Sequence, residues 1–303
     1  MIYQSITELV GKTPVIELQN LPDKNGAKVY VKIESFNPSG SVKDRAALSM
    51  IEEAEKRGEL KPKGTIIEPT SGNTGIGMAM VAAAKDYRLI IIMPGNATKE
   101  RIKLLEAYGA EVYLTPEELR MSGSIDKAKE LLAEIPNSYM PNQFVNPDNP
   151  KIHESTTAQE ILEDFPQGLD AFVATAGTGG TISGTGKVLR KHYQDLKIYV
   201  VEAKASPVIA GGEPGPHKIV GTGPGFIPDT LDREIYDEIL HITDEDAMET
   251  TRQLSRKEGI LAGVSAGAAV YMAVEKAKKM KPDQKVLAIV PDTGERYLSM
   301  DLF

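Results

Sequence analysis

The sequence predicts an α/β protein in which helices cover both faces of mostly parallel sheets. Short β-branched runs alternate with longer helical patterns along almost the whole chain, which is typical of parallel sheets connected by helices. Residues 89–93 (LIIIM) are apolar at every position, as expected for a strand covered on both sides. Two glycine-rich clusters each stand between a strand and a helix. A chain of 303 residues has room for two medium-sized domains.

The individual elements follow from the local patterns. Residues 28–33 (KVYVKI) alternate like a strand, and residues 41–57 read as a helix that ends at Gly58, a residue favoured just after a helix. Further strands are expected at 65–68, 89–93, 111–114, 171–175, 197–202 and 285–290. Further helices are expected at 77–85, 100–108, 125–133, 185–193, 247–258 and 266–279.

Two stretches interrupt this alternation. Residues 206–234 contain five prolines and six glycines, which indicates a long ordered loop of the kind that is often functional. Residues 136–150 are rich in proline and asparagine, so they are the best candidate for a crossing between domains.

Composition excludes several classes of protein. The 35 basic and 43 acidic residues give a net charge of −8, which disfavours a nucleic-acid partner. The chain has no apolar run of 18 residues and no signal-peptide pattern, so we expect neither a membrane span nor secretion. It has no cysteine, which excludes disulfides, thiolate zinc sites and a cysteine nucleophile and favours a cytoplasmic protein. The four histidines are scattered, so no metal site is expected and each is interpreted as a surface or packing residue.

The two glycine clusters are predicted anion sites. Residues 70–77 read TSGNTGIG and residues 177–184 read GTGGTISG. Glycine lets the backbone approach a ligand, and a helix N-terminus contributes partial positive charge. The dinucleotide pattern fails because Ile182 occupies the position of its third glycine, and no triphosphate-loop pattern is present. The two loops therefore suit one phosphate and one carboxylate.

Lys43 is a candidate catalytic residue. If Ser41 caps the helix, Lys43 lies in its first turn. A cation there opposes the helix dipole, and enclosure lowers the pKa of its amine, as a lysine that forms a Schiff base requires. The alternative is a lysine whose stem packs on the sheet and whose ammonium group lies in water.

A third pattern favours a different chemistry. Residues 263–267 match G-x-S-x-G, the nucleophile motif of α/β-hydrolases, with Ser265 as nucleophile. That fold places its histidine after the serine, whereas all four histidines here precede Ser265. The hydrolase interpretation therefore lacks its base.

Residues 37–45 and 68–76 resemble the cysteine synthase (O-acetylserine sulfhydrylase) family, pyridoxal-phosphate enzymes of fold type II. The match continues in family order through residues 142–147, 177–181, 215–219, 263–268 and 294–299. The resemblance implies two three-layer α/β/α domains, similar to the tryptophan synthase β subunit, with the cofactor in the cleft between them. We expect a smaller mobile domain at 41–145 and a larger, discontinuous domain formed by 1–40 and 146–303.

The resemblance also implies a role for each site residue. Lys43 holds pyridoxal 5'-phosphate covalently and then moves the substrate α-proton, Asn73 binds the ring hydroxyl oxygen, and Ser265 meets the ring nitrogen. The cofactor phosphate is cradled by Gly177, Thr178, Gly179, Gly180 and Thr181. The substrate carboxylate is bound by Thr70, Ser71, Asn73, Thr74 and Gln143. A neutral hydroxyl at the ring nitrogen suits β-elimination better than transamination.

The implied reaction converts O-acetyl-L-serine and sulfide into L-cysteine and acetate through an aminoacrylate, with closure of the smaller domain excluding water. Residues 265–268 read SAGA where the family commonly has SSGA, and Pro291-Asp292 replaces the usual Pro-Ser. These departures leave the substrate pair open.

Two alternatives therefore remain. The first uses the same cofactor to consume cysteine and release hydrogen sulfide, forming serine, lanthionine or cystathionine, with Asp232 as a candidate base. The second is a non-catalytic amino-acid or phosphate binding module.

The family resemblance implies partners as well. A homodimer is expected, and the apolar segment at residues 6–18 is a candidate for its interface. The C-terminal tail of serine acetyltransferase is a further candidate partner.

Overall fold

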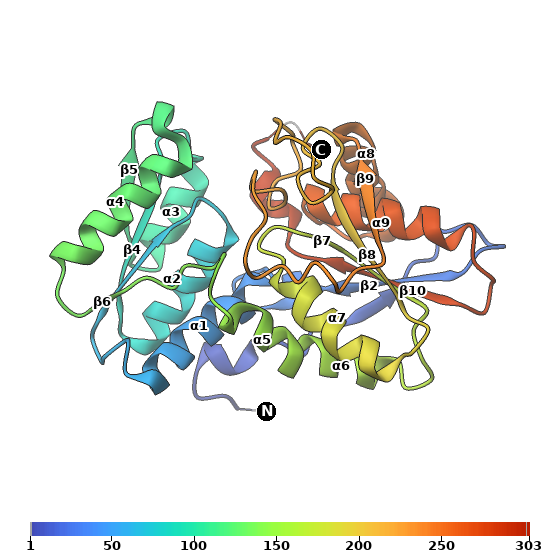
Figure 1. Ribbon diagram of the computed structural model, residues 1–303, viewed down its shortest axis with the longest axis horizontal. Helices are drawn as coiled ribbons and strands as arrows, with labels where there is room; N and C mark the ends of the chain where they lie inside the picture. The colour runs from blue at the N-terminus through green and yellow to red at the C-terminus, as the bar shows by residue number, and fades with distance from the viewer. Residues whose placement is uncertain (1, 301) are drawn as a thin grey trace. The chain divides into compact units, whose positions relative to one another are not determined.

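The computed structural model describes residues 2–300 and 302–303, and the chain forms two compact units (Figure 1). The smaller unit consists of the N-terminal residues through Val10 together with Lys43–Asn149. The larger unit consists of Gly11–Val42 and Pro150–Phe303. Both units are built on predominantly parallel sheets, and the predicted class, two three-layer α/β/α domains, is confirmed.

The smaller unit contains a parallel four-stranded sheet in the order β5-β4-β3-β6. Helices α1, α2 and α3 pack on one face around Ile66 and Ile91. Helix α4 covers the other face around Ile67, Ile90 and Ile92. Alternating apolar side chains thus serve both faces, as the LIIIM run predicts. The strands are β3 (Thr65–Pro69), β4 (Arg88–Pro94), β5 (Glu111–Thr115) and β6 (Ser138–Tyr139), and the helices are α1 (Lys43–Arg57), α2 (Asn73–Lys85), α3 (Lys99–Ala107) and α4 (Arg120–Glu134).

The larger unit contains a six-stranded sheet in the order β1-β2-β10-β7-β8-β9, in which only the β1–β2 pair is antiparallel. Helices α8 and α9 pack on one face, and α6 and α7 on the other (Figure 1). The strands are β1 (Val15–Glu17), β2 (Lys28–Ile33), β7 (Ala171–Thr175), β8 (Lys197–Ala203), β9 (Glu238–Ile242) and β10 (Lys285–Val290). The helices are α6 (Thr157–Asp164), α7 (Gly180–His192), α8 (Asp244–Gln253) and α9 (Val264–Ala277), and α5 (Asp148–Ser155) carries the chain into this unit.

Short helical turns complete the fold. The 3₁₀ turns are η1 (Ile6–Leu9), η2 (Glu34–Phe36), η3 (Glu117–Leu119) and η5 (Gly294–Tyr297), and η4 (Leu254–Glu258) is a π-helical turn. The helix predicted at 247–258 was therefore wrong as a single α-helix, since it spans part of α8 and this π turn.

The predicted strands 28–33, 171–175 and 285–290 are confirmed as β2, β7 and β10, whereas several helix starts were placed too late. Helix α2 begins at Asn73 and α7 at Gly180, because glycines in their first turns conceal the helical pattern. The backbone of Ser41 pairs with Asp292 in an isolated β-bridge, and α1 begins two residues later, at Lys43. Capping of α1 by Ser41 stays a prediction.

The N-terminal segment differs from its predicted domain. Residues 1–40 were assigned to the larger domain, but the residues through Val10 group with the smaller unit. The reason is apolar packing, since Val10 joins the cluster formed by α1 and α2. The chain passes between units at Val42–Lys43 and Asn149–Pro150, a few residues from the predicted boundaries at 40/41 and 145/146. Mobility of the smaller unit stays a prediction.

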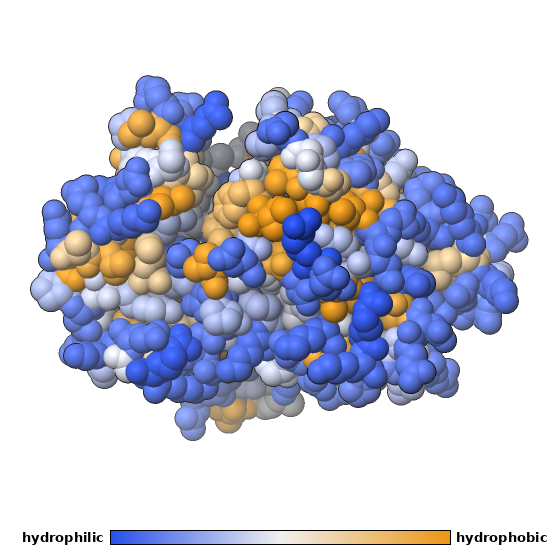
Figure 2. Space-filling model, in the orientation of Figure 1, coloured by the Kyte–Doolittle hydropathy of each residue, from blue (hydrophilic) through white to orange (hydrophobic). Residues whose placement is uncertain are grey.

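The long loop, residues 204–237, connects β8 to β9, and this fully described stretch contains no helix or strand. Its first part is anchored by Glu202, which is buried near the end of β8. The Glu202 carboxylate accepts hydrogen bonds from the backbone N–H groups of Ile209 (2.8 Å) and Ala210 (3.1 Å). Figure 2 shows apolar surface in the region where Figure 1 draws this loop, which carries the exposed Phe226. The predicted long ordered loop is confirmed.

Candidate active site

In the smaller unit, two predicted substrate-binding segments leave the same edge of the sheet. Strands β3 and β6 are parallel neighbours, so the segments that follow them emerge side by side. These segments are residues 70–74, here called the substrate loop, and residues 141–143. The hydroxyl of Thr74 donates a hydrogen bond of 2.5 Å to Oε1 of Gln143. Thr70, Thr74 and Gln143 are all buried, so the structure brings together residues that lie far apart in the sequence.

The substrate loop has an open and a supported side. Gly72 caps α2 with an extended backbone, and its N–H donates to Oγ1 of Thr70 at 3.2 Å. A Cβ atom at position 72 would meet nothing nearer than 4.0 Å, so the space beside the loop is open. From α3, the Arg101 guanidinium donates to the carbonyl oxygen of Ser71 at 3.0 Å. Asn73, the first residue of α2, is half-buried.

Lys43 is the first residue of α1 and is half-buried, which confirms its predicted place in the first turn. Its backbone packs against α2 where Gly77 leaves room. A Cβ atom at position 77 would lie 3.1 Å from the Lys43 carbonyl oxygen and 3.3 Å from Cβ of Ala47. The first turn of α1 therefore lies close to the first turns of α2, which carry Asn73 and Thr74.

The chain leading to Lys43 is fixed within the larger unit. The N–H of Val42 donates to the Pro291 carbonyl oxygen (2.8 Å), and the N–H of Thr293 donates to the Gly40 carbonyl oxygen (3.2 Å). The Arg296 guanidinium donates to the carbonyl oxygen of Ser39. These bonds fix the backbone immediately before the candidate lysine.

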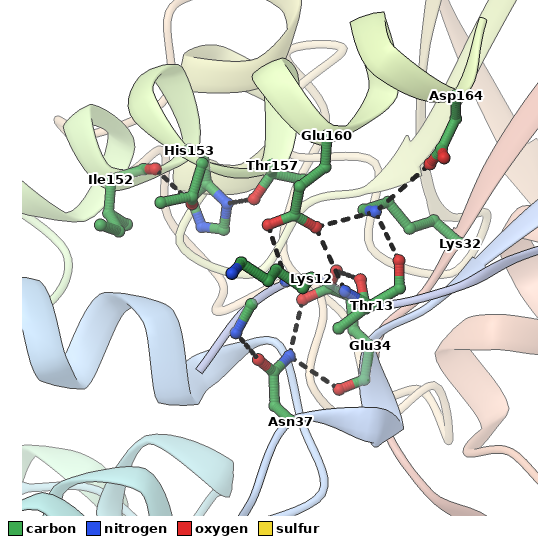
Figure 3. Close-up of polar contacts among 12 residues, drawn as sticks. Lys12, Thr13, Lys32, Glu34, Asn37, Ile152, His153, Thr157, Glu160 and Asp164 are labelled. Atoms are coloured by element: carbon green, nitrogen blue, oxygen red, sulfur yellow. Dashed lines mark hydrogen bonds and ion pairs between the residues drawn. The ribbon is translucent and has the colours of Figure 1, made fainter. Parts of the chain in front are cut away.

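A buried polar cluster in the larger unit supports the same segment from further upstream (Figure 3). The Glu34 carboxylate, fully buried, accepts hydrogen bonds from the Thr13 hydroxyl (2.7 Å) and the Asn37 amide (2.8 Å). Lys32 is also fully buried; its ammonium donates to the Thr13 carbonyl oxygen and pairs with Glu160, both at 2.9 Å. The buried polar groups named here thus have hydrogen-bond partners, and together with the bonds of Gly11, Lys12 and Thr13 to Asn37 and Glu160 they fix residues 11–13 and Asn37.

The second glycine cluster, residues 177–181, follows β7 and is here called the phosphate loop. Gly179 adopts φ +82° and precedes the first turn of α7. A Cβ atom on Gly177 would lie 2.3 Å from the Gly221 carbonyl oxygen, and one on Gly179 would lie 2.6 Å from Cβ of Leu231. The Thr230 hydroxyl donates to the Thr178 carbonyl oxygen at 2.6 Å. The long loop therefore closes one side of the phosphate loop, and only glycine fits at these two positions.

The phosphate loop fits a phosphate monoester. It offers the start of a 13-residue helix and two threonine hydroxyls, a donor set suited to a dianion. The close backbone packing fixes its shape before any ligand binds. Among the described residues, no group of three or more histidine, aspartate or glutamate side chains is arranged to hold a metal ion.

His153 was interpreted as a surface or packing residue, and the structure gives it a more specific place. It is almost fully buried. Its Nδ1 lies 2.8 Å from the Thr157 hydroxyl, and its Nε2 lies 3.4 Å from the hydroxyl of Thr181, the last residue of the phosphate loop. His153 and Thr157 lie in different helices, α5 and α6, and no spacing in the sequence indicates the contact with Thr181.

Ser265 lies at the same edge of the sheet as the phosphate loop. Strands β7 and β10 are parallel neighbours, and Asp292, just after β10, faces the glycine that precedes α9. A Cβ atom on Gly263 would lie 2.3 Å from Oδ1 of Asp292. Asp292 is buried and accepts a 2.6 Å hydrogen bond from the Tyr297 hydroxyl. Ser265, in the first turn of α9, is also buried.

Asp232, the candidate base of the alternative reaction, is exposed. Its Oδ1 accepts the N–H of Glu234 at 3.0 Å. These two residues therefore form a local turn at the surface of the long loop.

The fold and these loops match those of known proteins. Residues 6–292 match the family model described as pyridoxal-phosphate dependent enzyme. The chain therefore belongs to the pyridoxal-phosphate-dependent enzymes.

Individual relatives define the family more narrowly. The chain is 58% identical to a probable cysteine synthase of Bacillus subtilis, covering 100% of this chain and 98% of that protein. The crystal structure of an O-ureido-L-serine synthase superimposes with a TM-score of 0.97 at 44% identity, covering 100% of this chain and 96% of that one. The structure of a hydrogen sulfide-producing enzyme from Fusobacterium nucleatum gives a TM-score of 0.95 at 44% identity, with coverages of 98% and 99%. The chain is a member of the cysteine synthase family.

In the described part of the chain, no helix combines the length and the apolar character that crossing a bilayer requires.

Proposed function

We propose that this protein is a cysteine synthase that converts O-acetyl-L-serine and sulfide into L-cysteine and acetate. The observation that carries the proposal is that each unit has its own glycine loop: a closed phosphate loop in the larger unit, and an open, hydroxyl-rich loop near Lys43 in the smaller unit. The first loop suits a resident cofactor, and the second suits a substrate carboxylate. The 58% identity to the Bacillus subtilis relative supports the choice of substrates.

Residues of both units would hold pyridoxal phosphate. The phosphate loop would bind its phosphate, the Ser265 hydroxyl its ring nitrogen, Asn73 its ring oxygen and Lys43 its aldehyde carbon. When bound, the cofactor supplies an electron sink for negative charge at the substrate Cα. Ser265 is neutral, so it leaves the ring nitrogen unprotonated, which favours loss of a β-substituent over transamination.

The remaining steps are binding of the substrate and transfer of its α-proton. The α-carboxylate is bound, and the amino acid oriented, by Thr70, Ser71, Asn73, Thr74 and Gln143. Lys43 takes the proton from Cα as the bond between Cβ and the acetate oxygen breaks. Sulfide then forms the new C–S bond at Cβ, and Lys43 returns the proton to Cα.

The test is a substrate panel with purified holoenzyme. We expect L-cysteine to form from O-acetyl-L-serine and sulfide, and Lys43→Ala to abolish the reaction. Sulfide release from L-cysteine alone, without synthesis from O-acetyl-L-serine, would favour the cysteine-consuming alternative. A colourless protein that binds no pyridoxal phosphate would leave only the binding module.

Three further proposals concern partners and location. A homodimer is supported by the exposed apolar side chains of Ile2, Ile6 and Leu9 at the N-terminus, and light scattering measures the mass.

The C-terminal carboxylate of serine acetyltransferase suits the substrate loop. Competition between a peptide with that C-terminal sequence and O-acetyl-L-serine tests this binding. A cytoplasmic location is consistent with the absence of cysteine and is checked by cell fractionation.

A further inference from the structure

Glu68 is a buried carboxylate directly behind the substrate loop. It lies in β3, two residues before Thr70, and is 1% exposed. Its Oε2 accepts the N–H of Asn142 at 2.9 Å, and its Oε1 accepts the N–H of Gln143 at 3.3 Å. One side chain on β3 therefore binds two consecutive backbone groups of the other carboxylate-binding segment.

These bonds make Gln143 a residue that is held at three points. Its N–H is bound by Glu68, its carbonyl oxygen accepts from the Asn149 amide at 2.8 Å, and its side-chain oxygen accepts from Thr74 at 2.5 Å. The preceding residue, Asn142, has φ +53°, a left-handed conformation that asparagine adopts more readily than most other non-glycine residues. The hydrogen bond from its N–H to the Glu68 carboxylate helps to hold this conformation.

We infer that Glu68 is a positioning residue for substrate binding, which fixes Gln143 against Thr74 so that both meet the substrate α-carboxylate. This inference rests on the proposed function, in which these two residues bind that carboxylate. Glu68 acts through the backbone of residues 142–143, whose N–H groups it binds, and not through contact with the substrate or the cofactor.

The cost of keeping a carboxylate at this place supports the inference. Burial raises the pKa of the Glu68 carboxyl group from 4.5 to about 7, and the two backbone N–H groups only partly offset that rise. A buried apolar side chain at the same place would avoid the desolvation of a charge, but it would leave two buried N–H groups without an acceptor.

The larger unit offers a matched control. Glu202 is also a buried glutamate near the end of a parallel strand, and its carboxylate also accepts two consecutive backbone N–H groups, at 2.8 and 3.1 Å. The groups that it binds, in Ile209 and Ala210, belong to the long loop rather than to a predicted carboxylate-binding segment. Glu202 has one further partner, His241, whose Nε2 lies 3.1 Å from its Oε1. Glu202→Gln therefore makes the same carboxylate-to-amide change at a place where no substrate contact is expected, with His241 as one additional neighbour.

The experiment compares wild type, Glu68→Gln and Glu202→Gln as holoenzymes. L-Alanine, an amino acid without a leaving group, is titrated while the visible absorbance of the cofactor is followed, and kcat and KM for O-acetyl-L-serine are measured. In Glu68→Gln the amide NH₂ faces a backbone N–H, so we expect the Kd of L-alanine and the KM to rise about tenfold. We expect kcat to change less than about threefold, and Glu202→Gln to leave the Kd within about twofold of wild type.

The outcomes separate this inference from the proposed function. Equal L-alanine affinities in Glu68→Gln and wild type, with similar thermal destabilisation in both glutamine variants, overturn the inference alone. A wild type that binds no amino acid overturns the proposed function. If Glu68→Gln does not fold, hydrogen exchange on the wild type decides. Slow exchange of the Asn142 and Gln143 amides that slows further with L-alanine supports the inference, and fast exchange unaffected by L-alanine contradicts it.

Discussion

The phosphate loop and the substrate loop occupy equivalent places in the two units, each between a parallel strand and a helix, yet they are built differently. In the phosphate loop, the missing Cβ atoms of Gly177 and Gly179 would lie 2.3 and 2.6 Å from atoms of the long loop. In the substrate loop, Gly72 has an extended backbone and open space beside it. One loop is closed by packing and the other is held by hydrogen bonds.

This difference matches the residence time of the two proposed ligands. A cofactor that stays bound gains affinity from a rigid site that is formed in advance. A substrate must enter and leave on every turnover, and a loop that is held by a few hydrogen bonds can adjust at lower cost. The same local pattern, glycine before a helix, thus serves two purposes that only the surrounding packing distinguishes.

The largest expected effect is that of Lys43→Ala, which tests whether the phosphate loop retains the cofactor by itself. Turnover should fall by at least about 10³-fold, since the variant loses both the covalent link and the group that moves the α-proton. The cofactor should still bind non-covalently, as measured by equilibrium dialysis and absorbance. If the variant binds no pyridoxal phosphate, the closed phosphate loop is not sufficient to retain the cofactor. The difference in rigidity between the two loops would then be smaller than we infer.

A second test uses the ionisable group behind the substrate loop. The folded protein binds the Glu68 proton more tightly than the unfolded chain does, because its pKa is raised to about 7. The stabilising contribution is therefore complete below pH 4.5 and is lost as the pH rises to about 7, by up to about 3 kcal/mol. Urea denaturation at pH 5 and pH 8 should show a smaller pH dependence for Glu68→Gln than for wild type, with Glu202→Gln as the control. Equal pH dependences in wild type and Glu68→Gln would show that Glu68 does not titrate in this range.

A third test adds one methyl group to each loop. Gly177→Ala places Cβ against a backbone oxygen, so it should cost about 2 kcal/mol in the free energy of unfolding and weaken cofactor binding. Gly72→Ala meets only Oγ1 of Thr70, at 4.0 Å, so it should cost less than about 1 kcal/mol and leave cofactor affinity unchanged. Thermal denaturation and cofactor titration measure both effects. Similar losses in the two variants would contradict the assignment of one closed and one open loop.

The contrast between the loops also shows where prediction from the sequence succeeds. Buried parallel strands such as residues 89–93 were predicted correctly because a short, unbroken apolar run between helical patterns is typical of a strand that is covered on both faces. The first turns of α2 and α7 were missed because glycine, the residue that the loops require, has a low helix propensity. The resemblance to cysteine synthases, rather than periodicity, led to the separate roles for the two loops.

Long-range contacts account for what the sequence did not predict. The bond between Glu68 and Gln143 joins residues 75 positions apart, and no local pattern indicates which strand end faces which loop. The same holds for His153, which reaches Thr181 across 28 positions. Both contacts depend on strand order and register, and these follow from packing of the whole unit.

The smallest effects are expected for two matched substitutions, Thr74→Val in the substrate loop and Thr178→Val in the phosphate loop. Each replaces a hydroxyl by a methyl group of similar size. Thr74→Val removes the donor to Gln143 and should weaken amino-acid binding by about 1 kcal/mol, a roughly fivefold rise in the KM for O-acetyl-L-serine. Thr178→Val removes the hydroxyl that accepts the N–H of Gly180 and should weaken cofactor binding by a similar factor. Steady-state kinetics at saturating cofactor and cofactor titration without substrate separate the two effects. Because the loops are predicted to serve different ligands, each variant should change one affinity and leave the other within about twofold, and a variant that changed both equally would mean that the two loops respond as one site.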